Sequence, residues 1–224
     1  MIKHIIFDCF GTLIDTGNGS IKAVESILHN IGAFVDAKTF YADWKDAKKQ
    51  MMDSSKFRNE KTLFELSLAE TFDKYGIGAN ASEEVKPMIN SLFAERTVFP
   101  EVKETLQKLA EKEIDVAIGS TTDTDSLIHY LSSNHLAFSH IYTSEDMKVY
   151  KPNPDFYKTI LNRSGWAVSE CLFVGDSYLD DVYGPKSIGM RAALIDRKER
   201  YKGITLNPKP DYIIHTLGEV LKLS

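Results

Sequence analysis

From Pro100 to the end of the chain, short apolar runs alternate with longer amphipathic segments, and this alternation restricts the possible folds more than any other feature. The apolar runs predict strands at residues 114–118, 137–143, 171–174, 191–195 and 212–214. The amphipathic segments predict helices at residues 102–113, 125–134, 154–164 and 181–188. Strands that alternate with helices form a parallel sheet with helices on both faces. The sequence therefore predicts a three-layer α/β fold.

The first part of the chain has a different pattern. Residues 3–7 predict another buried strand, which ends at Asp8 and is followed by a turn at Gly11 and Thr12. Between residues 17 and 96, apolar residues recur at helical rather than strand spacing, which indicates an insert of roughly four helices. We therefore expect two domains. One consists of residues 1–16 and 97–224, and the other of residues 17–96.

Charge and cysteine content restrict the class of protein. The formal net charge is −5, with 27 basic and 32 acidic residues and no polybasic run, so we expect no nucleic-acid partner. The first apolar run is too short for a signal peptide or a membrane span. Cys9 and Cys171 lie in strand-like stretches, where buried, reduced cysteines are expected. These features predict a cytoplasmic protein without a membrane partner, either a monomer or a homodimer.

Polar side chains follow several of the predicted strands. Asp8 follows the first strand, and Ser120 and Thr121 follow the strand at 114–118. Because the carboxyl ends of parallel strands meet at one edge, where ligands bind in open α/β sheets, we expect these groups to lie close together. Further polar residues belong to the same edge, namely Lys151, Asp176 and Asp181. Buried carboxylates need a cation, which a lysine or a metal ion can supply.

Four stretches with these residues resemble the motifs of the haloacid dehalogenase-like hydrolases. They read FDCFGTLID, IGSTTD, YKPNPDFY and LFVGDSYLDDVYGPKSIGM, in the order and spacing of that family. The resemblance covers the predicted α/β part, about residues 1–16 and 98–224. It implies a Rossmann-like core, with the helical insert at 17–96 as a cap domain over the substrate.

The resemblance also implies roles for individual residues. Asp8 would be the nucleophile that forms a covalent aspartyl intermediate. Ser120, with Thr121 beside it, would bind the phosphoryl or carboxylate group of a small-molecule substrate, and Lys151 would neutralise negative charge. A Mg²⁺ ion would be held by Asp8, Asp176 and the main-chain carbonyl of Phe10. Asp181 would orient Lys151 or a metal-bound water.

Phe10 departs from the phosphatases of this family, which carry at that position an aspartate that protonates the leaving group. Four functions are therefore open. The first is a Mg²⁺-dependent phosphohydrolase of phosphorylated metabolites with good leaving groups. The second is a metal-free 2-haloacid dehalogenase, since those enzymes resemble this chain at Phe10. The others are a phosphonate C–P hydrolase and a non-catalytic binding protein.

Other positions separate the first two alternatives. Dehalogenases generally carry asparagine where this chain has Thr121, and small hydroxyl residues in place of Gly175 and Asp176. Without an ion, three carboxylates would share Lys151, so charge balance favours Mg²⁺. A dehalogenase also needs a cap arginine for its substrate carboxylate, where the similar stretch of this chain has Lys45.

Overall fold

A computed structural model of the protein describes residues 1–52, 56–94 and 96–223. Contacts divide the chain into two compact units. The first contains Met1–Asp15, Arg96–Thr121 and Leu131–Ser224, and the second contains Thr16–Glu95 and Thr122–Tyr130. Among the described residues, no helix has the length and apolar character that crossing a membrane requires.

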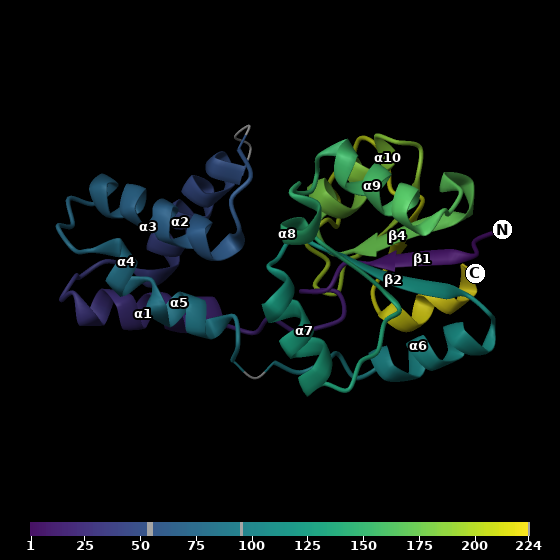
Figure 1. Ribbon diagram of the computed structural model, residues 1–224, viewed down its shortest axis with the longest axis horizontal. Helices are drawn as coiled ribbons and strands as arrows, with labels where there is room; N and C mark the ends of the chain where they lie inside the picture. The colour runs from purple at the N-terminus through teal and green to yellow at the C-terminus, as the bar shows by residue number, and fades with distance from the viewer. Residues whose placement is uncertain (53–55, 95, 224) are drawn as a thin grey trace. The chain divides into compact units, whose positions relative to one another are not determined.

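The first unit is built on a six-stranded sheet with the strand order β3-β2-β1-β4-β5-β6. Figure 1 labels the three central strands, β2, β1 and β4. All neighbouring strands are parallel. The strands are His4–Phe7 (β1), Asp115–Ser120 (β2), His140–Thr143 (β3), Cys171–Gly175 (β4), Arg191–Ile195 (β5) and Tyr212–Ile214 (β6). The sequence-based prediction of a parallel α/β sheet is confirmed.

Helices cover both faces of this sheet, with α9 and α10 on one side and α6 on the other (Figure 1). The helices of this unit are α6 (Val102–Glu111), α8 (Ser144–Met147), α9 (Pro154–Ser164), α10 (Gly184–Lys186), the 3₁₀ helices η1 (Val168–Glu170) and η3 (Leu217–Lys222), and the π-helix η2 (Leu179–Tyr183). Phe156 and Ile160 of α9 pack against Ile6 and Phe173 of the central strands. Fully burying a large apolar side chain stabilises a fold by about 1.5–3 kcal/mol, so the packing on this face of the sheet contributes strongly to the stability of the first unit.

The ends of α9 follow from its own residues. The side chain of Asn153 accepts a hydrogen bond from the N–H of Asp155 at 2.9 Å, and Pro154 occupies the first turn. Gly165 ends the helix with a φ of 73°, a backbone conformation that glycine adopts without steric cost. The capping residues therefore determine where α9 begins and ends, as the sequence predicts.

Two predicted elements differ from the structure. The strand predicted at 137–143 is shorter, because pairing with β2 begins only at His140, opposite Ala117. The helix predicted at 181–188 is replaced by η2 followed by the short α10. There the hydroxyl of Tyr157 donates to the carbonyl of Asp180, and a side chain at Gly184 would overlap the Tyr157 ring. Where α9 packs against this segment, the chain forms a π-helical turn, which is wider than a turn of α-helix.

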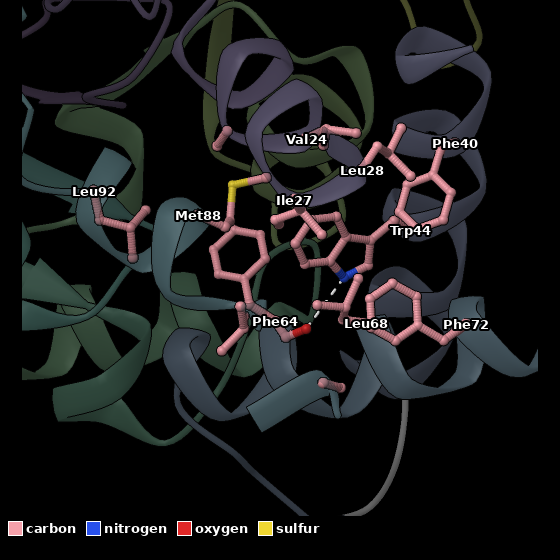
Figure 2. Close-up of a cluster of buried hydrophobic side chains, with 13 residues drawn as sticks. Val24, Ile27, Leu28, Phe40, Trp44, Phe64, Leu68, Phe72, Met88 and Leu92 are labelled. Atoms are coloured by element: carbon pink, nitrogen blue, oxygen red, sulfur yellow. Dashed lines mark hydrogen bonds between the residues drawn. The ribbon is translucent and has the colours of Figure 1, made fainter. Parts of the chain in front are cut away.

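The second unit consists mainly of helices around an aromatic core. Its helices are α1 (Gly19–Asn30), α2 (Ala37–Met52), α3 (Glu60–Lys74), and the short α4 (Ala81–Glu84) and α5 (Lys86–Ser91). Figure 2 shows Trp44 of α2 among apolar side chains of the neighbouring helices, including Phe64 and Leu68 of α3. The indole N–H donates to the carbonyl of Phe64 at 3.2 Å and to the hydroxyl of Ser67 at 2.8 Å, so this buried polar group is satisfied.

The segment 122–130, which includes most of α7 (Thr124–Ser133), is grouped with the helical unit. The hydroxyl of Tyr130, for example, donates to the carbonyl of Ser91 at 3.0 Å. The sequence pattern predicts that this segment belongs to the α/β domain, because helical periodicity does not reveal which neighbours a helix packs against. The division into two separate domains, with boundaries at residues 16 and 97, stays a prediction.

Candidate active site

The parallel register brings several strand ends to one edge of the sheet. Strand β1 lies between β2 and β4, with Phe7 opposite Ile118 on one side and Val174 on the other. Asp8 follows directly, and its N–H donates to the carbonyl of Val174 at 2.8 Å. The Asp8 carboxylate is therefore held beside the ends of both neighbouring strands, and only 7% of the residue is exposed.

Lys151 joins two carboxylates in this buried region. Its Nζ lies 2.8 Å from Oδ1 of Asp8 and 2.8 Å from Oδ1 of Asp181. Burial by itself would lower the pKa of Lys151, but the carboxylates of Asp181 and Asp8 outweigh that effect and hold the pKa above its usual value. The ammonium group therefore stays charged and serves as a fixed counter-ion for both acids.

Asp181 is oriented by the turn after β4. Its Oδ2 accepts a hydrogen bond from the N–H of Ser177 at 2.9 Å, while Oδ1 faces Lys151. Any side chain at Gly175 would overlap the Asp181 carboxyl group, so the glycine makes room for this acid. Both oxygens of Asp181 thus have partners within the protein, which suits a residue that positions Lys151.

Negative charge is in excess around Asp8. Burial raises the pKa of Asp8; Lys151 opposes this effect, while Asp181 and Asp176 add to it, and the resulting pKa is about 7. Burial, followed by the charge of Asp181, also raises the pKa of Asp176. Two carboxylates with raised pKa values indicate that this site favours a further cation.

The acidic cluster has the composition of a site for a hard divalent cation. Asp8, Asp176 and Asp181 each offer a carboxylate oxygen, and these atoms all lie within 4.8 Å of one another. Gly11 has a φ of 89°, and a Cβ at this position would lie 2.7 Å from Oδ1 of Asp176. Because Gly11 has no side chain, the turn after β1 can approach the Asp176 carboxylate closely. Oxygen ligands of this kind suit Mg²⁺, so the residues present fit the ion that the sequence analysis expected.

Arg200 is a second cation at this cluster, which the motifs in the sequence did not predict. Its Nη2 donates to Oδ2 of Asp176 at 2.8 Å and to the Asp176 carbonyl at 2.7 Å. The expectation that the three carboxylates share Lys151 alone is therefore wrong. The sequence does contain a signal for this role. Arg200 follows β5, whose carboxyl end belongs to the same edge of the sheet.

Ser120 is the last residue of β2 and lies at the same edge. β2 is the neighbour of β1, and Ser120 is 1% exposed. Thr121 follows it and is partly buried. Their predicted contacts with a substrate stay a prediction, since the register places them beside Asp8 without establishing what they bind.

The next two residues of this loop are tied to the helical unit. Oδ1 of Asp123 accepts from the N–H of Glu60 at 2.7 Å, and Oδ2 accepts from the N–H of Lys61 at 3.2 Å. The hydroxyl of Thr122 donates to Oε2 of Glu60 at 2.9 Å, and Nζ of Lys48 lies 2.6 Å from Oε1. Nothing in the local sequence pattern of these residues indicated this network.

Phe10 lies in the turn after β1. The guanidinium of Arg96 lies 5.5 Å from the centre of its ring, which is the geometry of a cation–π contact. The N–H of Gly11 donates to the carbonyl of Ile14 at 2.8 Å and closes the turn. The ring supplies no proton donor, and the predicted role of the Phe10 carbonyl as a metal ligand stays a prediction.

A model of the haloacid dehalogenase-like hydrolase family matches residues 2–189 of the chain. The pyrophosphatase PpaX of Bacillus velezensis is 27% identical over 232 residues, which cover 100% of this chain and 96% of the relative. The (S)-2-haloacid dehalogenase 4A of Burkholderia cepacia is 24% identical over 207 residues, which cover 88% of this chain and 84% of the relative.

The solved structure of the HAD-hydrolase YfnB from Bacillus subtilis, bound to magnesium, superimposes with a TM-score of 0.81. The alignment covers 99% of this chain and 98% of that chain at 16% identity. At this level of identity, the similarity shows a common fold.

Proposed function

The chain belongs to the haloacid dehalogenase-like hydrolase family, and on that premise we propose that it is a Mg²⁺-dependent phosphohydrolase of small phosphorylated metabolites with good leaving groups. The observation that carries this proposal is the cluster of Asp8, Asp176 and Asp181, whose carboxylate oxygens lie within 4.8 Å of one another. Relatives such as PpaX, a pyrophosphatase, support phosphoryl chemistry. The two cysteines are free and buried, which supports the predicted cytoplasmic location.

In the proposed mechanism, Asp8 is the nucleophile. An oxygen of its carboxylate attacks the phosphorus atom, and the leaving group departs with the bonding electron pair, which produces an aspartyl phosphate. Water then attacks the phosphorus, restores the Asp8 carboxylate and releases inorganic phosphate. Lys151 keeps the Asp8 carboxylate in place and neutralises charge that develops on the phosphoryl oxygens, while Ser120 binds the same group.

Asp8, Asp176 and the Phe10 carbonyl would hold Mg²⁺. The ion, when bound, supplies positive charge that favours the ionised form of Asp8 and stabilises the transferring phosphoryl group. Asp8 and Asp176 each use one carboxylate oxygen for a cationic side chain, so the second oxygen of each can serve as a metal ligand. Asp181 positions Lys151 through the contact described above.

Phe10 determines which leaving groups are suitable. A positioned general acid typically contributes about 10²–10⁴-fold to the rate, and phenylalanine has no proton to donate. Acyl and aryl phosphates release a stabilised anion that does not need a proton, whereas simple alkyl phosphates release a strongly basic alkoxide. We therefore propose activated phosphates as the substrate class.

The proposal is tested by turnover of acetyl phosphate and para-nitrophenyl phosphate. We expect turnover with Mg²⁺, loss of turnover on addition of EDTA, and recovery with excess Mg²⁺. Asp8→Asn removes the nucleophile and is expected to abolish turnover in the presence of Mg²⁺. Activity that is unchanged by EDTA would contradict the metal-dependent mechanism.

A 2-haloacid dehalogenase is the second candidate, and two observations favour it. Halide leaves without a proton, which suits Phe10, and Arg200 supplies a second cation that a metal-free site could use. The Burkholderia cepacia relative is itself a dehalogenase. Release of chloride from L-2-chloropropionate in EDTA would support this function, and its absence at high enzyme concentration would exclude it.

A further inference from the structure

The turn after β5 is built so that Arg200 reaches the acidic cluster. The buried carboxylate of Asp196 accepts hydrogen bonds from the N–H of Arg200 at 2.8 Å and from the N–H of Tyr201 at 2.9 Å. The Tyr201 hydroxyl in turn accepts from the N–H of Tyr178, in the turn after β4, at 3.1 Å. The backbone at Arg200 is therefore fixed from two sides, while its side chain is 48% exposed.

Arg200 forms its ion pair with Asp176, whereas Lys151 pairs with the other two carboxylates of the cluster. Lys151 forms ion pairs with Asp8 and Asp181, each at 2.8 Å. Arg200 contacts Asp176 at 2.8 Å and also binds its carbonyl oxygen. The three carboxylates thus have two side-chain cations as partners, and the partner of Asp176 is the exposed one, which can move into solvent.

We infer that Arg200 is a built-in counter-cation of Asp176 that opposes the binding of a divalent ion, and that it thereby lowers the affinity of the site for Mg²⁺. The inference rests on the metal site of the proposed function. Its physical basis is that a guanidinium and a divalent cation repel each other when both contact one carboxylate. At a separation of about 5 Å in water-like surroundings, this repulsion weakens binding roughly ten- to twentyfold.

The test is a calorimetric titration of the metal-free protein with MgCl₂ at constant ionic strength. Arg200→Gln removes the charge and keeps a polar side chain, and we expect it to bind Mg²⁺ about tenfold more tightly than the unaltered protein. Lys202→Gln is the matched control, because Lys202 is a nearby exposed cation that pairs with Glu199. It removes the same charge from the turn and should leave the affinity almost unchanged. Thermal unfolding verifies that each variant is folded.

The outcomes separate this inference from the proposed function. If only Arg200→Gln binds Mg²⁺, the inference is supported, and the unaltered protein does not work as a Mg²⁺ enzyme. If both bind with equal affinity, or if the variant binds more weakly, Arg200 does not compete with the ion and the inference is wrong, although the proposed function stands. If neither the unaltered protein nor Arg200→Gln binds Mg²⁺, the inference and the proposed function are both wrong, because removal of the guanidinium should open the site.

Discussion

At the scale of single residues, the chemistry of the site depends on whether each buried charge has a partner. Lys151 is the central case, because one ammonium group contacts both Asp8 and Asp181 while almost no part of its side chain is exposed. Removing one member of a buried ion pair leaves an uncompensated charge, which costs far more than loss of an exposed pair. The folded state therefore depends on this lysine as much as the proposed reaction does.

We predict that Lys151→Met lowers the free energy of unfolding by about 3–5 kcal/mol. The measurement is urea denaturation in the absence of divalent cations. Lys158→Met is the control, because its ion pair with Asp155 is exposed, and its effect should not exceed about 1 kcal/mol. Equal losses in the two variants would show that the buried pair contributes no special stability.

Phe10 provides the second prediction at this scale. Phe10→Asp introduces a carboxyl group that can protonate a leaving alkoxide, so we expect turnover of alkyl phosphates to rise by about tenfold or more, while acyl phosphates change little. Phe10→Asn is the matched control, since its amide has a similar size and no acidic proton. No gain with the aspartate, or the same gain with asparagine, would mean that another group already acts as the acid.

At the scale of secondary structure elements, Glu101 links the start of α6 to two distant segments. Its Oε1 lies 2.5 Å from Nη1 of Arg197 and accepts from the N–H of Leu217, at the start of η3, at 3.1 Å. The Arg197 guanidinium also lies 3.7 Å from the centre of the Phe99 ring. Burial alone would raise the pKa of Glu101, but the hydrogen bonds from Arg197 and Leu217 prevail and lower it below the usual value.

This shift has a defined pH dependence. A carboxyl group whose pKa is lower in the folded state stabilises the protein above its unfolded pKa, near 4.5, and that contribution disappears as the pH falls through the folded pKa. We therefore predict that Glu101→Gln lowers the stability at pH 7 by up to about 1 kcal/mol, and that this loss shrinks as the pH falls from 7 to below 4.5.

Thermal or urea unfolding measured across this pH range checks the prediction. Glu104→Gln is the comparison, because Glu104 pairs with Lys108 of the same helix and is more exposed. Its effect on stability at pH 7 should be smaller. A loss for Glu101→Gln that stayed constant at every acidic pH at which the protein is folded would point to lost packing rather than to the ionised carboxylate.

At the scale of the whole molecule, the chain passes from one compact unit to the other directly after Thr121. Thr121 is the last residue of its segment in the first unit, and Thr122 begins a segment of the second. Asp123 accepts hydrogen bonds from two N–H groups in the first turn of α3, and Asn59 accepts from the N–H of Thr62 in the same turn. The loop after β2 therefore contributes to the stability of the helical unit as well as to the candidate site.

We predict that Asp123→Ala destabilises the helical unit by about 1–2 kcal/mol, because the first turn of α3 loses acceptors for its N–H groups. Trp44 lies in the core of that unit, so its fluorescence during urea unfolding reports the loss, most cleanly in a Trp166→Phe background. Asp123→Asn retains one acceptor oxygen and should lose less. An unchanged midpoint for Trp44 would show that Asn59 alone is sufficient.

Local sequence information was sufficient for much of the fold. The strand that leads to Asp8, the strand that ends at Gly175, and both ends of α9 follow from residues within a few positions of one another. The parallel arrangement then places Asp8, Ser120 and Asp176 at one edge, as predicted. Hydrophobic periodicity and capping chemistry act over short separations, so they can be recognised in a single chain.

The tertiary structure decided which distant groups became partners. Arg200 is 24 residues from Asp176, and Asp123 is 63 residues from Glu60, yet each pair is in hydrogen-bond contact. The local pattern around each of these residues fits an exposed turn equally well, because a contact between distant residues depends on how whole elements pack. The sequence by itself therefore determined the α/β sheet and its row of carboxylates, whereas the tertiary structure decided which side chains balance their charge.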